Sequence, residues 1–218
     1  MADLNTFERH IRHLVSRIPR DGSTVDLQTL FFQLTLDSAT EFLFGESVNS
    51  LTSPEESEQQ KFGKAFDYAQ SQLGNRSRWG KLFRFYKYSE FDIACKTVHD
   101  FVDKIVDRTL EKTEPLDVEK IIDGDGEQHR YVFLTEMAKA TRDAKRLRDE
   151  LLNVLLAGRD TTASLLSHTF FVLARRPDIW KKLQAEVDGL HGVLPDYETL
   201  RSMKYLKYLL TECEYLAT

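Results

Sequence analysis

Six consecutive residues in the last third of the chain combine side chains that could carry out chemistry. They run from Ala157 to Thr162 as AGRDTT, and they interrupt an otherwise apolar segment from Leu151 to Leu173. Glycine costs about 1 kcal/mol relative to alanine inside a helix, and unpaired charges are costly in apolar surroundings. Such locally unfavourable choices are expected at functional positions, although a kink without any ligand could also produce them.

Helical spacing places the small residues and one hydroxyl of this segment together. Thr161 follows Ala157 by four residues and Gly158 by three, so all three share a helix face. The Thr161 hydroxyl can bond the Ala157 carbonyl, and Gly158, which has no side chain, lets another molecule approach the backbone. The apolar flanks predict that protein surrounds this helix on nearly every side.

Three- and four-residue apolar spacing dominates the rest of the chain, and alternating patterns are almost absent, which predicts a mainly α-helical fold. Gly45 is expected to cap the second helix, Gly74 to break the third, and Arg176-Pro177-Asp178 to form a turn that starts a new helix. The predicted helices run from about Leu4 to Ile18, Asp26 to Gly45, Phe62 to Leu73, Phe91 to Leu110, Thr135 to Asp149, Leu151 to Leu173, Pro177 to Val187, and from Asp196 onward. No second domain boundary is apparent, so residues 1–218 are predicted to form one incomplete domain.

Three connecting segments are expected between these helices. Glu46 to Gln60 is a polar connection, and Arg76 to Tyr88 mixes basic and aromatic side chains. A loop that Pro115 opens contains the run from Asp123 to Gly126, which is a predicted turn because it lacks the ligand spacing of a calcium loop.

Charge and cysteine usage exclude several classes of function. The 30 Lys and Arg residues against 35 Asp and Glu give a net charge of -5, which offers no electrostatic reason to bind nucleic acid. The two cysteines, Cys95 and Cys213, lie far apart and form no zinc or dithiol motif, as expected in a reducing compartment. No apolar run reaches the roughly 18 to 20 residues that span a bilayer.

The AGRDTT segment resembles the oxygen-binding signature of cytochrome P450 enzymes, [AG]-G-x-[DE]-T-[TS], and every defined position matches. The continuation TTASLLSHTFFVLARRPDIWKKLQAEV is most similar to the fungal P450 group that hydroxylates n-alkanes and fatty acids. The resemblance implies a partial P450 fold, in which a helical core surrounds a long central oxygen-binding helix and the haem-loop region is missing. It would extend from about the fourth main helix to the helix that carries E-x-x-R.

By this resemblance, Thr161 would hydrogen-bond the dioxygen bound over the haem iron, and Asp160 would help to deliver protons for O–O cleavage. Ala157 and Gly158 would leave room over the iron, and Thr162 would lie on the same haem-facing helix. Glu212 in YLKYLLTECEYLAT would be the structural glutamate of E-x-x-R, although Tyr215 stands at the arginine position.

Two further P450 elements are absent from this chain. The loop F-x-x-G-x-x-x-C-x-G, whose thiolate ligates haem iron, has no counterpart at Cys95 or Cys213. The W-x-x-x-R helix, which meets a haem propionate, would fall upstream of Met1. The chain is therefore expected to be inactive by itself and to be the central piece of a longer enzyme.

For the complete protein, the resemblance implies a haem-thiolate monooxygenase that acts on fatty acids, alkanes or similar lipophilic molecules. Electrons would come from NADPH through a flavoprotein reductase, at the cytosolic face of the endoplasmic reticulum membrane, with the membrane contacts made by regions absent here. The alternative is a non-catalytic helical relic or interaction module derived from a P450.

The histidines offer weaker alternatives. His10 and His13 are three residues apart on a helix and could clamp a metal, but Arg9 and Arg12 add positive charge beside them. His168 follows Thr161 by seven residues and could border a substrate cavity, although ordinary packing is the favoured interpretation.

Overall fold

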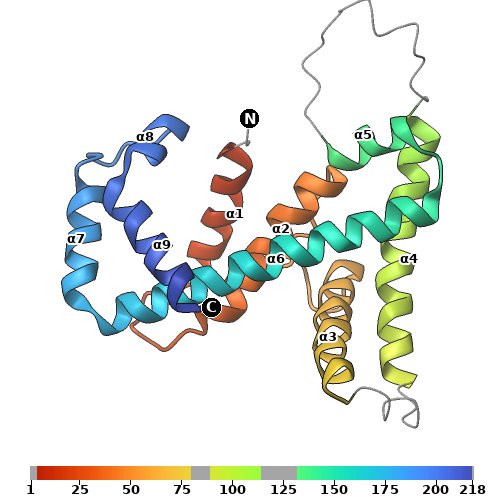
Figure 1. The fold of residues 1–218 in the computed structure, drawn as a ribbon, viewed down its shortest axis with the longest axis horizontal. Coiled ribbons are helices and arrows are strands. Elements are labelled where there is room, and N and C mark those ends of the chain that lie inside the picture. Colours follow the sequence, from red (N-terminus) through yellow and green to blue (C-terminus); the bar gives the residue numbers. More distant parts are fainter. Residues whose placement is uncertain (1–3, 80–88, 114–131, 218) are drawn as a thin grey trace, which may run out of the picture. The chain divides into compact units, whose positions relative to one another are not determined.

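The computed structural model describes residues 4–79, 89–113 and 132–217. These residues form α-helices and no β-strand, which confirms the predicted mainly α-helical class (Figure 1). The helices are α1 (Leu4–Ser16), α2 (Leu27–Phe44), α3 (Glu58–Trp79), α4 (Ser89–Lys112), α5 (Phe133–Ala140), α6 (Ala144–Arg175), α7 (Pro177–Asp188), α8 (Tyr197–Ser202) and α9 (Lys204–Ala217).

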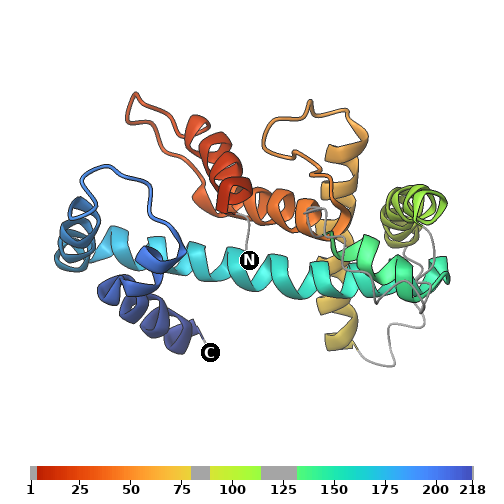
Figure 2. The ribbon, with the colours of Figure 1, turned by 90° about the horizontal axis from the view of Figure 1, so that it is seen from above.

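The chain divides into two compact units. The first contains the described residues of 1–35 and 158–218, and the second those of 36–157. The expectation of a single incomplete domain stays a prediction. The helix that carries the AGRDTT segment, α6, is unbroken from Ala144 to Arg175 (Figure 2).

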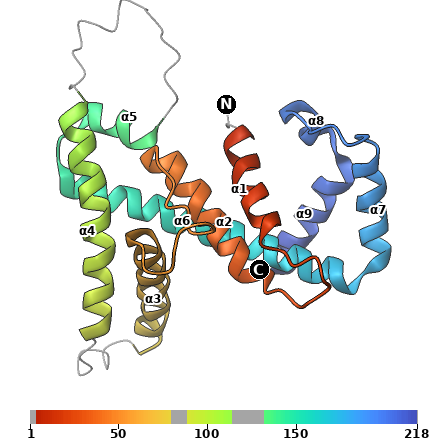
Figure 3. The ribbon, with the colours of Figure 1, turned by 180° about the vertical axis from the view of Figure 1, so that it is seen from behind.

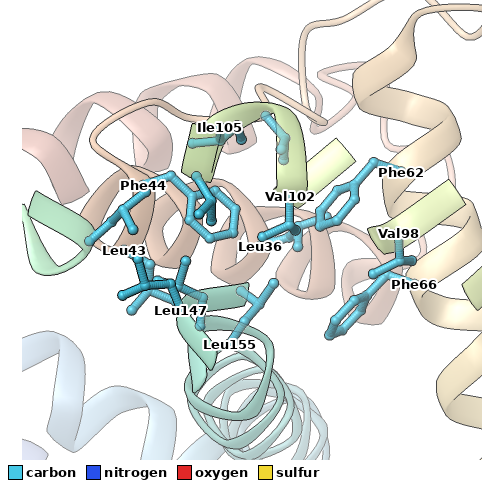
Figure 4. Close-up of a cluster of buried hydrophobic side chains, with 14 of the residues drawn as sticks. Leu36, Leu43, Phe44, Phe62, Phe66, Val98, Val102, Ile105, Leu147 and Leu155 are labelled. Atoms are coloured by element: carbon cyan, nitrogen blue, oxygen red, sulfur yellow. The ribbon is translucent and has the colours of Figure 1, made fainter. Parts of the chain in front are cut away.

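The core of the second unit is an apolar cluster to which five helices contribute. Within this unit α3 and α4 lie side by side (Figures 1 and 3). Phe62 of α3 stacks on Phe101 of α4 with ring centroids 4.4 Å apart, and Leu147 and Leu155 of α6 belong to the same cluster (Figure 4). Burying each such side chain contributes about 1.5–3 kcal/mol, so this cluster fixes the N-terminal part of α6.

Polar contacts anchor the edges of the same unit. The buried Asp37 carboxylate accepts hydrogen bonds from the backbone N–H groups of Ser50 (2.5 Å) and Leu51 (3.1 Å), which fixes the connection after α2. On α6, Arg148 donates to Asp103 of α4. Burial lowers the pKa of Arg148, but its hydrogen bonds to Asp103 and Asp149 raise it, and the net shift is upward.

The first unit packs α7 and α9 against the C-terminal part of α6. Leu173, Leu209 and Cys213 form its buried cluster, with Ile179 and Leu183 of α7 against it. Pro177 is the first residue of α7, as predicted, because a proline lacks only an N–H that has no partner at that position.

A carboxylate of α7 caps α9 in this unit. The two oxygens of Glu186 accept hydrogen bonds from the backbone N–H groups of Tyr205 (2.9 Å) and Leu206 (2.8 Å). These N–H groups lie in the first turn of α9, where no intrahelical acceptor exists. Glu186 therefore supplies, from a distant part of the sequence, a cap that local sequence lacks.

Several predicted boundaries are right. Gly45 follows α2 directly and has φ +79°, the left-handed conformation that glycine adopts at helix ends. Helix α4 spans the predicted segment and extends it slightly at both ends. The loop at Pro115 and the turn from Asp123 to Gly126 lie outside the described residues, as does the 80–88 part of the basic-aromatic segment.

The predicted break at Gly74 is wrong, because α3 continues to Trp79. Gly74 is exposed, and its cost of about 1 kcal/mol is small enough for the flanking turns to outweigh it.

Two predicted helices are each interrupted. The helix expected from Thr135 to Asp149 stops at Thr141, whose backbone is extended (φ -148°, ψ 145°), and α6 begins anew where Asp143 Oδ1 accepts the Arg146 N–H (3.1 Å). The helix expected from Asp196 stops at Met203, which is buried and not helical. In the first case a local cap, and in the second the burial of a side chain, is favoured over continued helical hydrogen bonding.

Candidate functional site

The AGRDTT segment lies in the middle of α6 and is α-helical throughout. Leu147, Leu151 and Leu155, on the preceding turns, are fully buried in the core of the second unit. In the first unit, Ala163 and Leu173 of the same helix are buried. Within each unit, buried residues therefore anchor the part of α6 that belongs to it.

The small and hydroxylic residues of the segment lie on an open side of α6. Gly158, Thr161 and Thr162 are exposed, and so is Ala157, the last residue of the second unit. A Cβ atom built at Gly158 would meet no atom within 4 Å outside its own neighbourhood in the helix. Asp160 is half-buried, with its side chain 20% exposed.

The expectation that protein surrounds this helix is wrong for the described residues. Val154, Leu156 and Phe171 are all more than a third exposed, and Phe171 reaches 56%. The buried leucines recur every four residues along one side of the helix, and this spacing leaves the other side uncovered.

Arg159 is the functional candidate that sequence reasoning missed. It occupies the undefined position of the signature, yet its relative exposure is only 1%. By residue volume it is the largest fully buried side chain among the described residues. Its Nη1 lies 3.2 Å from Asp160 Oδ1, and its guanidinium carbon lies 5.0 Å from the centroid of the Phe32 ring. A basic residue inside an apolar helix was the signal, because a buried charge requires partners.

Glu212 lies on the exposed side of α9, and the neighbouring Cys213 is buried. The side chain of Tyr215, at the family's arginine position, lies outside those that the structure describes. The structural role of Glu212 stays a prediction. Cys95 is half-buried, and both cysteines are reduced.

The histidine alternatives gain no metal site. The rings of His10 and His13 have centroids 6.2 Å apart, and in the described part of the chain no group of three or more His, Cys, Asp or Glu side chains is placed to hold a metal ion. His168 is half-buried, and its Nε2 has no hydrogen-bond partner among the described residues.

The open side of α6 leaves room for a prosthetic group. Gly158 carries no side chain, the space before it is open, and the exposed Thr161 adds a hydroxyl on the same side.

No described helix is both long and apolar enough to cross a membrane.

Comparison with known proteins identifies the fold and the family. A sequence profile described as Cytochrome P450 matches residues 4–213. The chain belongs to the cytochrome P450 family. Cytochrome P450 monooxygenase fsdH of Fusarium heterosporum is 41% identical over 221 residues, which cover 97% of this chain and 38% of the relative. Cytochrome P450 52A1 of Candida tropicalis is 41% identical over 229 residues, covering 97% and 41%.

A solved structure supports the same fold. The crystal structure of cytochrome P450DA heme domain superposes with a TM-score of 0.72 at 20% identity, over 96% of this chain and 42% of that one. The predicted partial P450 fold and the predicted similarity to fungal P450 enzymes are confirmed. The chain spans about two fifths of the length of the curated relatives it matches.

Proposed function

We propose that this chain is the central part of a haem-thiolate monooxygenase that hydroxylates C–H bonds of fatty acids, alkanes or similar lipophilic molecules. The observation that carries the proposal is that Gly158, Thr161 and Thr162, which match the oxygen-binding signature, are exposed on the open side of α6 with free space before Gly158. The resemblance of the segment after Thr161 to the fungal P450 group that hydroxylates n-alkanes and fatty acids supports the choice of substrate class.

The haem, when bound, supplies an iron centre that activates dioxygen with electrons from NADPH through a flavoprotein reductase. Gly158 leaves room for the group beside the helix backbone, and Ala157, which precedes it in the chain, is small and exposed. Thr161 places a hydroxyl, both donor and acceptor, on the same open side. Asp160, half-buried next to it, exchanges protons between the interior and the open side, and Thr162 adds a second hydroxyl.

Other parts of the proposal concern the complete protein. Glu212 of α9 supports the haem-binding core, and the thiolate ligand comes from a segment outside this chain. The proposed partners are the flavoprotein reductase and a lipophilic substrate. The proposed location is the cytosolic face of the endoplasmic reticulum membrane.

The first experiment uses the longest in-frame protein that the source transcript encodes around residues 4–213. This protein is expressed together with a reductase in the presence of a haem precursor. After reduction and addition of carbon monoxide, it is expected to show the absorption band of thiolate-ligated haem. Dodecanoic acid or dodecane is then expected to yield a hydroxylated product. A well-folded protein without that band would refute the proposal and would favour the non-catalytic helical module.

Thr161→Ala tests the central hydroxyl in the same protein. The ratio of product to NADPH consumed is expected to fall roughly tenfold or more, because a positioned proton-transfer group typically contributes about 100-fold to 10,000-fold to the step that it catalyses. Ser167→Ala is the matched control, since Ser167 lies on the same helix and its hydroxyl donates a local hydrogen bond to the Ala163 carbonyl (2.7 Å). We call this ratio of product to NADPH consumed the coupling. Equal coupling in the Thr161 variant and the wild type would show that Thr161 does not have this role.

A further inference from the structure

We propose that Arg159 is a positioning residue that holds the Asp160 carboxylate in the orientation used for proton transfer. The inference rests on the proposed function, because it concerns the same oxygen-binding segment. All three residues that carry it, Phe32, Arg159 and Asp160, belong to the first unit.

The burial of Arg159 calls for compensation of its charge. Its side chain is 2% exposed, and removing a guanidinium from water is unfavourable unless opposite charge or an aromatic face replaces the lost hydration. The structure supplies both: the Phe32 ring lies 5.0 Å from the guanidinium carbon, and Asp160 Oδ1 lies 3.2 Å from Nη1. The cation is therefore held between α2 and the carboxylate.

Helix geometry explains why this contact orients Asp160. Neighbouring residues on a helix point about 100° apart and do not ordinarily face each other. Asp160 lies between the buried Arg159 and the exposed Thr161 around the helix, and its carboxylate turns back to meet the guanidinium. One carboxylate oxygen is thus fixed at the border between the interior and the open side, next to the Thr161 position.

A second arginine of α6 shows which feature matters. Arg175 lies 5.0 Å over the Phe171 ring, as Arg159 does over Phe32, but both Arg175 and Phe171 are exposed. Arg175 thus reproduces the aromatic contact without the burial and without a place in the segment. It is the natural control.

The test compares Arg159→Gln, Arg159→Lys and Arg175→Gln in the complete haem-loaded protein with dodecanoic acid as substrate. Arg159→Gln is expected to lower product per NADPH roughly fivefold to tenfold, less than loss of a whole proton-transfer group. It is also expected to raise the solvent deuterium isotope effect on turnover, while the spectral Kd of substrate stays unchanged. Arg159→Lys is expected to recover part of the coupling, and Arg175→Gln to behave as wild type.

A double-mutant cycle with Asp160→Asn decides whether Arg159 acts through Asp160. If it does, Arg159→Gln has little further effect on coupling in the Asp160→Asn background, and the shifts in the urea-unfolding midpoint are also non-additive. Additive effects in both measurements would overturn the inference while leaving the proposed function intact. A wild-type protein without thiolate-ligated haem would instead remove the proposed function and this role with it.

Phe32→Leu covers the case in which the Arg159 variants do not fold. Leucine keeps an apolar side chain of similar size and removes the aromatic face, so the guanidinium loses its contact with the Phe32 ring. Coupling is expected to fall to a value between those of wild type and Asp160→Asn. Coupling equal to wild type would count against the positioning role.

Discussion

Gly158→Ala should make the protein more stable and, in the complete enzyme, less active. The residue lies inside α6, is exposed, and has no atom within 4 Å of a built Cβ. The added methyl group therefore loses nothing by collision and gains helix propensity, while alanine also reduces the conformational freedom of the unfolded chain.

The expected gain follows from these two effects and from nothing else at this position. Alanine is favoured over glycine in a helix interior by about 0.8–1.0 kcal/mol, and for a chain of this size 1 kcal/mol corresponds to roughly 2–4 °C in Tm. Gly74 of α3 is equally open and should show the same gain. Gly63 should gain less, because a Cβ there would lie 3.3 Å from Leu36 Cδ2.

Urea and thermal unfolding of the three variants of the haem-free chain of 218 residues measure these gains directly. In the haem-loaded complete protein, Gly158→Ala is expected to lower the rate of substrate-dependent oxygen consumption, and Gly74→Ala to leave it unchanged. A loss of stability in Gly158→Ala beside a gain in Gly74→Ala would refute the reasoning, because it would mean that the space at Gly158 is filled.

Two further predictions concern other polar groups of the first unit. Glu186→Ala should lower the free energy of unfolding by about 1–2 kcal/mol, because α9 loses its cap, and should speed hydrogen exchange of the Tyr205 and Leu206 amides. Gln184→Ala, at an exposed position of the same helix, is the control and should change neither quantity. Unchanged exchange in Glu186→Ala would mean that Glu186 does not cap α9. The hydrogen bond from Arg176 lowers the pKa of Asp178 from 3.8 to about 2, so its stabilising contribution is present above pH 3.8 and is lost as the pH falls through about 2. In Arg176→Gln, the pKa of Asp178 should return toward 3.8, which carboxyl NMR titration measures. The same Asp178 pKa in the variant and in the wild type would show that the Arg176–Asp178 pair does not persist in solution.

Local sequence rules determined much of the fold. Apolar spacing predicted α4 closely, Gly45 and Pro177 marked helix ends correctly, and the AGRDTT segment indicated the family. Each of these signals lies within a few neighbouring residues: a glycine adopts a positive φ, and a proline tolerates the first helical position, whatever surrounds them.

Tertiary structure decided what those residues contact. The sequence alone does not pair Glu186 with the start of α9, or Phe32 with Arg159, and it leaves Arg159 at the undefined position of the motif. Nor could it say that Gly74 would stay helical or that α6 would restart after Thr141. The Glu186 cap and the aromatic partner of the buried Arg159 depend on groups far away in the sequence, which folding alone brings together. The helix at Gly74 and the restart of α6 depend instead on small differences between competing local free energies, which residue types alone do not rank.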